Sequence, residues 1–337
     1  MSEGHVTRDG VQGERPDREA TVGVNTGRRG GRRRSRGEQP MVPDASFSSY
    51  YGRPVIKPPV WTWEVPCYLF TGGLAGASAA LGSAAGAAGN RPLARRAWLV
   101  AFAGVTASPV LLVADLGRPE RFLNMLRMFK LTSPMSVGSW ILTASGAATA
   151  FATAHELFGW FPRLGPLGKA ASAILGPALA TYIAVLFADT AVPVWHEGHR
   201  ELPFVFAGSA MASAGAAAVA LTPRTHAGPA RRLSVAGAVL ELAAAAAMQR
   251  RLGDIGEPLR SGRGGRHART GRALTAMGSS LIALRSRRTR AAAVLGSAAV
   301  LAGALGERWA MFEAGKASAS DPKYTVGPQR QRVATSD

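Results

Sequence analysis

A charged connector, Asp115–Trp140, joins two long apolar runs and carries the residues best suited to chemistry. It begins DLGRPERFLN, which places Asp115, Arg118, Glu120 and Asn124 close together in the chain. If the flanking runs cross a membrane, these side chains are held at the lipid–water boundary, where ionisable groups are costly and are functional candidates by default. We therefore treat them as candidates for binding a polar ligand or for moving protons there.

Polar groups also stand at the ends of other apolar runs. Glu64 opens the first run and Asp189 closes the fourth. Tyr182 precedes Asp189 by about two helical turns, and His196 lies in the loop that follows. Carboxylates, a phenol and an imidazole at one depth can hydrogen-bond the carbonyl oxygens of a quinone head and pass the accompanying protons. The plainer alternative, that each group caps a helix or pairs with a loop arginine, stays open.

Three further ionisable residues are candidates for a proton path. Glu241 lies deep inside the sixth run, with no charged residue within a helical turn. It should face the bundle interior, where a proton relay and a structural hydrogen bond between helices explain it equally well. His155 and Glu156 end the third run on the opposite side. They form either the far end of such a path or an interfacial cap.

The sequence offers few ligands for a metal. It has one cysteine, Cys67, and six histidines scattered along the chain. One thiol cannot build a cysteine-ligated zinc site or an iron–sulfur cluster. A bis-histidine haem needs two facing imidazoles at span depth, and only His155 touches an apolar run. We therefore expect no metal, no haem and no iron–sulfur cluster on this chain, so electrons must arrive from a partner.

Apolar runs dominate residues 46–310 and predict an all-α fold, a polytopic bundle of transmembrane helices. The mean hydropathy of +0.06 conceals them because the runs are rich in Ala and Gly, small residues that closely packed membrane helices use at their contacts. The seventh run is short and flanked by arginines, so six or seven spans remain possible. The eight expected spans lie near residues 65–88, 97–114, 136–156, 170–188, 202–221, 233–250, 271–284 and 291–307.

The seven tryptophans all fall near the ends of these runs, which favours a membrane protein. Indole rings prefer the membrane interface, so we expect them to form an aromatic belt. The tryptophans are Trp61, Trp63, Trp98, Trp140, Trp160, Trp195 and Trp309.

The termini are polar. Residues 1–45 include the run RRGGRRRSRG and cannot bury enough apolar surface to fold, so we predict a disordered basic tail there, and a polar C-terminal tail over residues 311–337. The net charge of +19 fits anionic lipid headgroups better than nucleic acid, because the arginines gather in the tail and the loops. With eight spans, both termini share the more basic side, which predicts termini in the cytoplasm of a plasma-membrane protein. The loops alone do not distinguish the two sides.

Three blocks of the sequence resemble the NrfD/PsrC family, the integral membrane subunits of polysulfide reductase and nitrite reductase type. The strongest block is Asp115–Trp140, DLGRPERFLNMLRMFKLTSPMSVGSW. Two supporting blocks are WTWEVPCYLFTGGLAGAS at Trp61–Ser78 and TAVPVWHEGHRELPFVFAGSAMASAG at Thr190–Gly215. Together with the intervening spans they cover most of residues 50–250, whereas the last third matches only in its helical pattern.

The resemblance implies an eight-helix subunit that exchanges electrons between menaquinone or another quinone and an iron–sulfur partner. That partner would be a four-cluster ferredoxin-like subunit serving a molybdopterin catalytic subunit. This chain would then perform only the quinone half-reaction, in anaerobic respiration with formate, polysulfide, thiosulfate, tetrathionate or nitrite, and an assumed cytoplasmic docking face favours a formate dehydrogenase. Glu64 and Tyr182 best match the family's polar positions, although some members have Asn and His where this chain has Trp and Glu around position 64. The residues that would line or support the same region are Asp115, Arg118, Glu120, Asp189 and His196.

Basic residues in and beside the connector suit docking of an acidic partner by complementary charge. These residues are Arg118, Arg121, Arg127 and Lys130.

Two other functions stay open. A secondary transporter would also use intramembrane acids and proline-interrupted helices, although no inverted repeat is evident. A structural membrane anchor would have no quinone site. A transporter should move solute without a partner, and an anchor should tolerate changes at Glu64, Tyr182 or Asp189.

Overall fold

The computed structural model describes residues 5–7, 10–12, 54–116 and 119–336. The chain divides into two units, residues 1–53 and 54–337. In the first, β1 (His5–Thr7) and β2 (Gly10–Gln12) pair antiparallel, with Val6 opposite Val11. The rest of the tail predicted over residues 1–45 lies outside the described residues.

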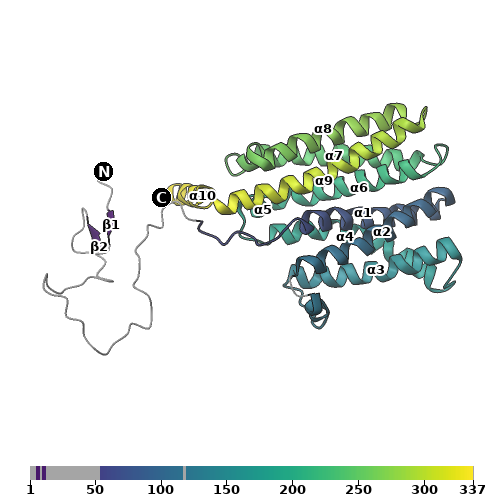
Figure 1. Ribbon diagram of the computed structural model, residues 1–337, viewed down its shortest axis with the longest axis horizontal. Coiled ribbons are helices and arrows are strands. Elements are labelled where there is room, and N and C mark those ends of the chain that lie inside the picture. Colours follow the sequence, from purple (N-terminus) through teal and green to yellow (C-terminus); the bar gives the residue numbers. More distant parts are fainter. Residues whose placement is uncertain (1–4, 8–9, 13–53, 117–118, 337) are drawn as a thin grey trace, which may run out of the picture. The chain divides into compact units, whose positions relative to one another are not determined.

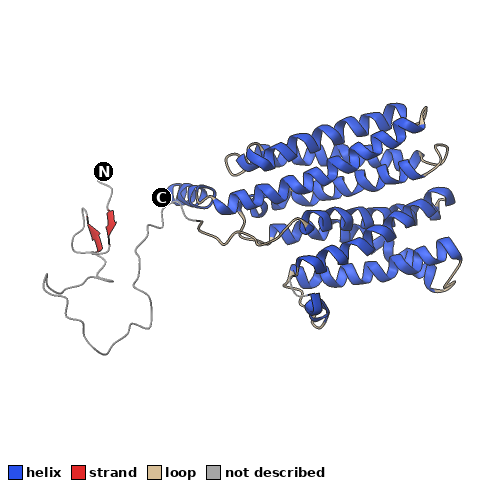
Figure 2. Ribbon diagram, in the orientation of Figure 1, coloured by secondary structure: helices blue, strands red, loops and turns tan. Residues whose placement is uncertain are grey.

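In its described part, the second unit contains eight long helices, one for each expected span (Figures 1 and 2). The long helices are α1 (Glu64–Ala87), α2 (Arg91–Asp115), α3 (Pro134–Phe158), α4 (Leu164–Ala188), α6 (Leu202–Leu221), α7 (Gly228–Leu252), α8 (Gly262–Arg285) and α9 (Arg290–Ser320). The short ones are η2 (Pro119–Leu126), α5 (Pro193–Glu197), η3 (Gly198–Arg200), η4 (Glu257–Leu259) and α10 (Lys323–Ser336).

Local sequence signals set several helix ends. The Asn90 side chain accepts a hydrogen bond from Leu93 N at the start of α2, and Ser133 and Thr289 cap α3 and α9 in the same way. Pro134 occupies the first turn of α3, where its missing N–H costs nothing. Gly159 ends α3 in the left-handed conformation at φ 72°.

Six of the described helices are long and apolar enough to cross a membrane: α1, α2, α4, α6, α7 and α9. The weak seventh run proves to be the end of a longer helix, because α8 starts at Gly262 and takes in four arginines before its apolar part. Because of those arginines, α8 is not among the six helices that are apolar enough to cross a membrane. The fold is all-helical in the second unit, as predicted.

The C-terminal boundary differs from the expectation of a polar tail from residue 311. Helix α9 continues to Ser320 because residues beyond 307 remain buried, among them Met311 and Phe312. A Cβ on Gly315 would overlap the Trp195 ring, so this glycine lets α5 pack directly on α9. α10 then follows after a two-residue break.

The long helices form two groups of four that meet side by side. α1–α4 contact one another, α6–α9 do the same, and α1 and α4 contact α6 across the boundary (Figure 1). Chain direction alternates between successive long helices. The ends of α2, α4, α7 and α9 therefore lie with the starts of α1, α3, α6 and α8 at one end of the bundle, which we call the connector end.

Helices α1 and α4 touch through their backbones. A Cβ added to Gly76 would overlap the carbonyl oxygen of Gly176, and a Cβ on Gly176 would overlap that of Gly76. Gly208 and Gly237 bring α6 and α7 together in the same way. This is the small-residue packing that holds helices together in lipid, where the hydrophobic effect cannot do so.

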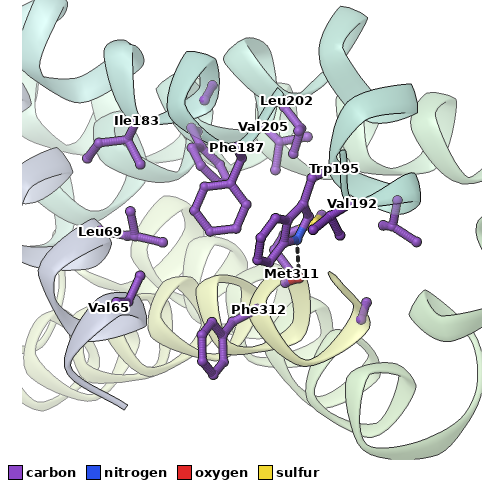
Figure 3. Packing of buried hydrophobic residues seen from close by; sticks show 14 of the residues in the cluster. Val65, Leu69, Ile183, Phe187, Val192, Trp195, Leu202, Val205, Met311 and Phe312 are labelled. Atoms are coloured by element: carbon purple, nitrogen blue, oxygen red, sulfur yellow. Dashed lines mark hydrogen bonds between the residues drawn. The ribbon is translucent and has the colours of Figure 1, made fainter. Parts of the chain in front are cut away.

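The belt prediction is wrong for two of the seven tryptophans. Trp98 and Trp195 are fully buried. Trp98 packs against Gly82 of α1, where a Cβ would lie 2.9 Å from the ring. Trp195 stacks on Trp61. It also donates from Nε1 to the Met311 carbonyl oxygen at 2.7 Å (Figure 3). Both rings join helices, so their position near helix ends has a packing cause.

Candidate functional site

Two predicted carboxylates meet at the connector end through a threonine. The backbone N and Oγ1 of Thr62 donate to Asp115 Oδ1 at 3.3 and 3.0 Å, which ties the end of α2 to the start of α1. Thr62 Oγ1 also contacts Glu64 Oε2. A hydroxyl carries a single proton, so the three groups form a small network through which a proton can be exchanged between two carboxyl groups.

One turn further along α1, Tyr68 contacts Tyr182 of α4 through the two phenolic oxygens. Tyr68 is buried, with 4% of its surface exposed, and Tyr182 is half-buried. A Cβ on Gly138 of α3 would overlap the Tyr182 ring, so this glycine makes room for the phenol. One hydroxyl donates to the other, which leaves the acceptor's own proton free for a further partner.

The Tyr182 ring and Asp189 line a groove of about 450 Å³ between the start of α3 and the end of α4. Its volume lies within the range of ligand sites, and its walls are mostly apolar with few polar groups. The groove therefore offers one phenol and one carboxylate to a flat, mainly apolar ligand. The other lining residues are Leu131, Thr132, Pro134, Val137, Val185 and Ala188.

The predicted quinone-site residues thus form two neighbouring groups. Glu64 and Asp115 make the outer group, and Tyr182 and Asp189 line the groove. Tyr68 lies between the two groups, because it touches Tyr182 and is four residues, about 6 Å of helix rise, from Glu64.

His196 lies beside the groove but points to the end of α4. Its Nδ1 lies 3.1 Å from the carbonyl oxygen of Ala188, a groove residue, and the imidazole is exposed. Packing of Phe187 and Trp195 below it fixes this end of α4, with ring centroids 4.3 Å apart (Figure 3). His196 therefore supports the groove wall from outside.

Apart from Asp115, the described candidate residues of the connector lie outside the groove and are exposed. Glu120 is exposed on η2, and Arg127 and Lys130 are exposed between η2 and α3. Arg118 lies outside the described residues, and the Arg121 side chain is likewise not described. The three described side chains line no part of the groove.

Glu241 has charged neighbours that its own helix did not reveal. It is buried on α7, beside Ser209 of α6, and its carboxyl group interacts with Arg308 and Glu307 of α9. Arg308 is 2% exposed, lies 3.9 Å over the Phe206 ring and donates to the Phe206 carbonyl oxygen at 3.1 Å.

This buried ionic cluster extends to α8 through a contact of 3.7 Å between Arg272 Nη2 and Glu307 Oε1. Within the described part of the chain, Glu241 Oε2 has no hydrogen-bond partner. Such a cluster compensates its own charge inside the bundle and leaves one carboxylate oxygen available.

His155 and Glu156 lie at the opposite end of the bundle. Glu156 pairs with Lys169 of α4, and His155 Nδ1 lies 3.3 Å from the Trp160 carbonyl oxygen. The structure does not bring them to Glu241, because α3 packs chiefly against α2 and α4, whereas α7 packs chiefly against α6 and α8.

Sequence reasoning missed Thr62, Tyr68 and Gly138. The signal for Tyr68 was its spacing of four residues from Glu64, which puts both on one helix face. A threonine two residues before Glu64 gave a weaker signal. Nothing in the sequence marked Gly138 among so many glycines.

Among the described residues, no group of three or more His, Cys, Asp or Glu side chains is arranged to hold a metal ion. Six membrane-length apolar helices and a polar layer at one end of the bundle define a multi-pass membrane protein.

The family model described as polysulfide reductase, of NrfD type, matches residues 47–320. The chain therefore belongs to the NrfD polysulfide reductase family, as its resemblance predicted. No curated protein matched the chain. In general, members of this family are quinone-reactive membrane subunits of redox complexes and pair with iron–sulfur and catalytic subunits.

Proposed function

We propose that this chain binds a quinone in the groove beside Tyr182 and Asp189 and exchanges electrons between it and an iron–sulfur partner. The observation that carries the proposal is the Tyr68–Tyr182 contact, which brings a second phenol, from the helix that Glu64 begins, to the wall of an apolar groove. A bound quinone supplies two-electron, two-proton redox chemistry. The groove fits its ring, because the walls are apolar and two polar groups stand at one side.

Each side chain then has a stated task. The Tyr182 hydroxyl donates a hydrogen bond, and finally a proton, to a carbonyl oxygen in the groove. Tyr68 orients that hydroxyl and returns a proton to it. Glu64 and Asp115 take up protons at the bundle end, with the Thr62 hydroxyl between them. Asp189 accepts a hydrogen bond when the ligand carries a hydroxyl in place of a carbonyl oxygen.

The partner would dock at the connector end. Arg127 and Lys130 are exposed there, and Arg118, Arg121 and Glu120 belong to the same connector in sequence. A four-cluster ferredoxin-like subunit with an acidic face suits these cations, and it would serve a molybdopterin catalytic subunit. The termini would then face the cytoplasm across the plasma membrane. Menaquinone is one candidate ligand and formate one candidate substrate of the complex.

A proton path through Glu241 is a second part of the proposal. Its buried carboxyl group has one oxygen without a partner among the described residues, which suits a proton-carrying group. A route that ended at His155 and Glu156 would need further groups between α3 and α7. Glu241→Gln should keep quinone-dependent electron transfer and change proton uptake by vesicles.

Purification of the tagged chain from mild detergent tests the main proposal. We expect an iron–sulfur protein to accompany it and a quinone to be extracted from it by organic solvent. Replacing Arg127 and Lys130 by Glu should release the partner and leave the quinone bound. A chain that carries neither, and that moves solute in vesicles by itself, would be a transporter. A chain that keeps its partner but never binds quinone would be an anchor.

A further inference from the structure

A second, larger groove opens at the bundle end opposite the connector. It measures about 1090 Å³ and lies between the end of α1, the start of α2, the end of α3 and the start of α4. Arg91, Arg95 and Lys169 line it, together with His155 and Glu156. We call it the basic groove. None of the residues proposed to bind quinone lines it.

The charges in the basic groove are not balanced. Glu156 pairs with Lys169, so these two neutralise each other. No ion pair with a carboxylate is found for Arg91 or Arg95 in the described part of the chain, and Arg95 Nη2 makes only a long 3.5 Å hydrogen bond to the Leu157 carbonyl oxygen. Two guanidinium groups facing one groove suit a phosphate, which they can bind bidentately.

The basic groove borders an apolar cavity, with which it shares two wall residues. Ala80 and Ala84 of α1 line both the groove and a cavity of about 340 Å³ whose walls are almost entirely hydrocarbon. This apolar channel lies between α1, α4, α6 and α7, and it includes Ala77, Pro177 and Met211. From Ala87 to Ala77, α1 rises about 15 Å towards the middle of the bundle. Small side chains on α1 leave this space open.

A basic groove at the helix ends, bordered by an apolar cavity nearer the middle of the bundle, matches a molecule with an anionic head and a hydrocarbon tail. We propose that the two cavities bind an anionic glycerophospholipid, with its phosphate between Arg91 and Arg95 and an acyl chain along Ala84 and Ala80. A free phosphate ion would make no use of the apolar channel. An uncharged quinone head would leave both guanidinium groups without a partner. In this proposal His155 and Glu156 form part of the wall of the lipid site. The lipid site does not depend on the proposed quinone site.

Native mass spectrometry of the full-length chain, purified with any subunits that accompany it, tests the proposal. Phosphatidylglycerol and phosphatidylcholine are titrated into the detergent, and bound lipid is counted. Each basic residue near an anionic lipid contributes roughly a fivefold change in affinity, so Arg91→Gln with Arg95→Gln should weaken phosphatidylglycerol binding roughly 30-fold. The matched control is Arg287→Gln with Arg288→Gln, which removes the same charge from exposed positions at the same end of the bundle.

A second variant keeps the charge and fills the channel. Ala80→Leu with Ala84→Leu should also abolish tight phosphatidylglycerol binding, while any stabilisation by inorganic phosphate, measured as a melting shift, stays unchanged. If the double variant does not fold, Ala84→Leu alone serves, because Ala84 is exposed. Equal lipid loss in the control, full lipid retention in the arginine variant, or equal affinity for phosphatidylcholine would overturn the proposal. Phosphate binding without lipid binding would reduce the basic groove to an anion site and overturn it as well.

Discussion

Removal of the Tyr182 hydroxyl is the sharpest test of the polar layer at the connector end. In Tyr182→Phe the groove loses its phenol, and Tyr68, which is 4% exposed, loses its contact with the Tyr182 hydroxyl. Loss of a positioned proton donor typically costs a factor of 100 to 10,000, so quinone-dependent electron transfer should fall at least about 100-fold. Tyr68→Phe removes the orienting hydrogen bond, worth about 1 kcal/mol, together with the hydroxyl that returns a proton to Tyr182, and should cost at least about fivefold.

Stability should follow the same order as activity in the two single variants but not in the double variant. Tyr182→Phe leaves the buried Tyr68 hydroxyl without its partner and should destabilise the protein by about 1–3 kcal/mol. Tyr68→Phe leaves the half-buried Tyr182 hydroxyl able to find another partner, so its cost should be smaller. The double variant removes both hydroxyls and should recover most of the loss, since two matched apolar groups need no partner.

The assay is quinol-dependent reduction of an artificial acceptor by the purified complex, alongside thermal unfolding in detergent. Tyr324→Phe is the matched control, because it removes a phenol that contacts Glu257 Oε2 at 3.2 Å, in a cavity that no proposed quinone ligand lines. Activity of Tyr182→Phe within twofold of the unchanged protein would refute the assigned role. A double variant less stable than Tyr182→Phe would refute the phenol pair.

Other changes probe the same framework. Gly138→Ala should push the Tyr182 ring from its place, because a Cβ there overlaps it; we expect a cost of about 1–3 kcal/mol and weaker quinone binding, read by thermal unfolding and by titration. Arg308→Met leaves only Arg272 to compensate two buried carboxylates, Glu241 and Glu307, and should cost about 3–5 kcal/mol at neutral pH, whereas a loss below about 1 kcal/mol would contradict the cluster. Hydrogen bonds from the Arg251 guanidinium, at 2.6 Å, lower the pKa of Glu201. The stabilisation from the Glu201–Arg251 pair is therefore complete above the ordinary pKa of a glutamate and is lost as the pH falls through the lowered pKa of Glu201. Unfolding curves measured from pH 7 to pH 3 should show this loss of stability. In Glu201→Gln the pH-dependent loss due to this pair should be absent.

The helices were predictable because their apolar runs are long and their caps are local. Asn90, Ser133 and Gly159 mark helix ends by chemistry that acts over a few residues. The alternation of chain direction then placed Glu64 and Asp115 at one end without further information. The groove between α3 and α4 could not be predicted from the sequence in this way, because its shape depends on which faces of those helices meet.

The buried ionic cluster shows where sequence reasoning stopped. Glu241 was singled out, but Arg308 lies 67 positions away and stands in the sequence at the edge of an apolar run. Pairing between distant helices is decided by packing, which a linear pattern does not contain. Arg272 was likewise read as a flank of the seventh run, and only the longer α8 places it inside a helix facing Glu307.

The contact between Gly76 and Gly176 bears on how a lipid-soluble molecule reaches Tyr182 and leaves again. Two helices whose backbones touch cannot slide or separate without losing the backbone contact, so we expect α1 and α4 to move as one rigid unit. Tyr182 lies on this unit, about 9 Å further along α4 than Gly176. If a quinone binds beside Tyr182, we expect any opening of the groove to come from its other wall, at Leu131, Thr132 and Pro134. The proposed ligand would then enter laterally, from the surrounding bilayer leaflet, without a passage along the bundle axis.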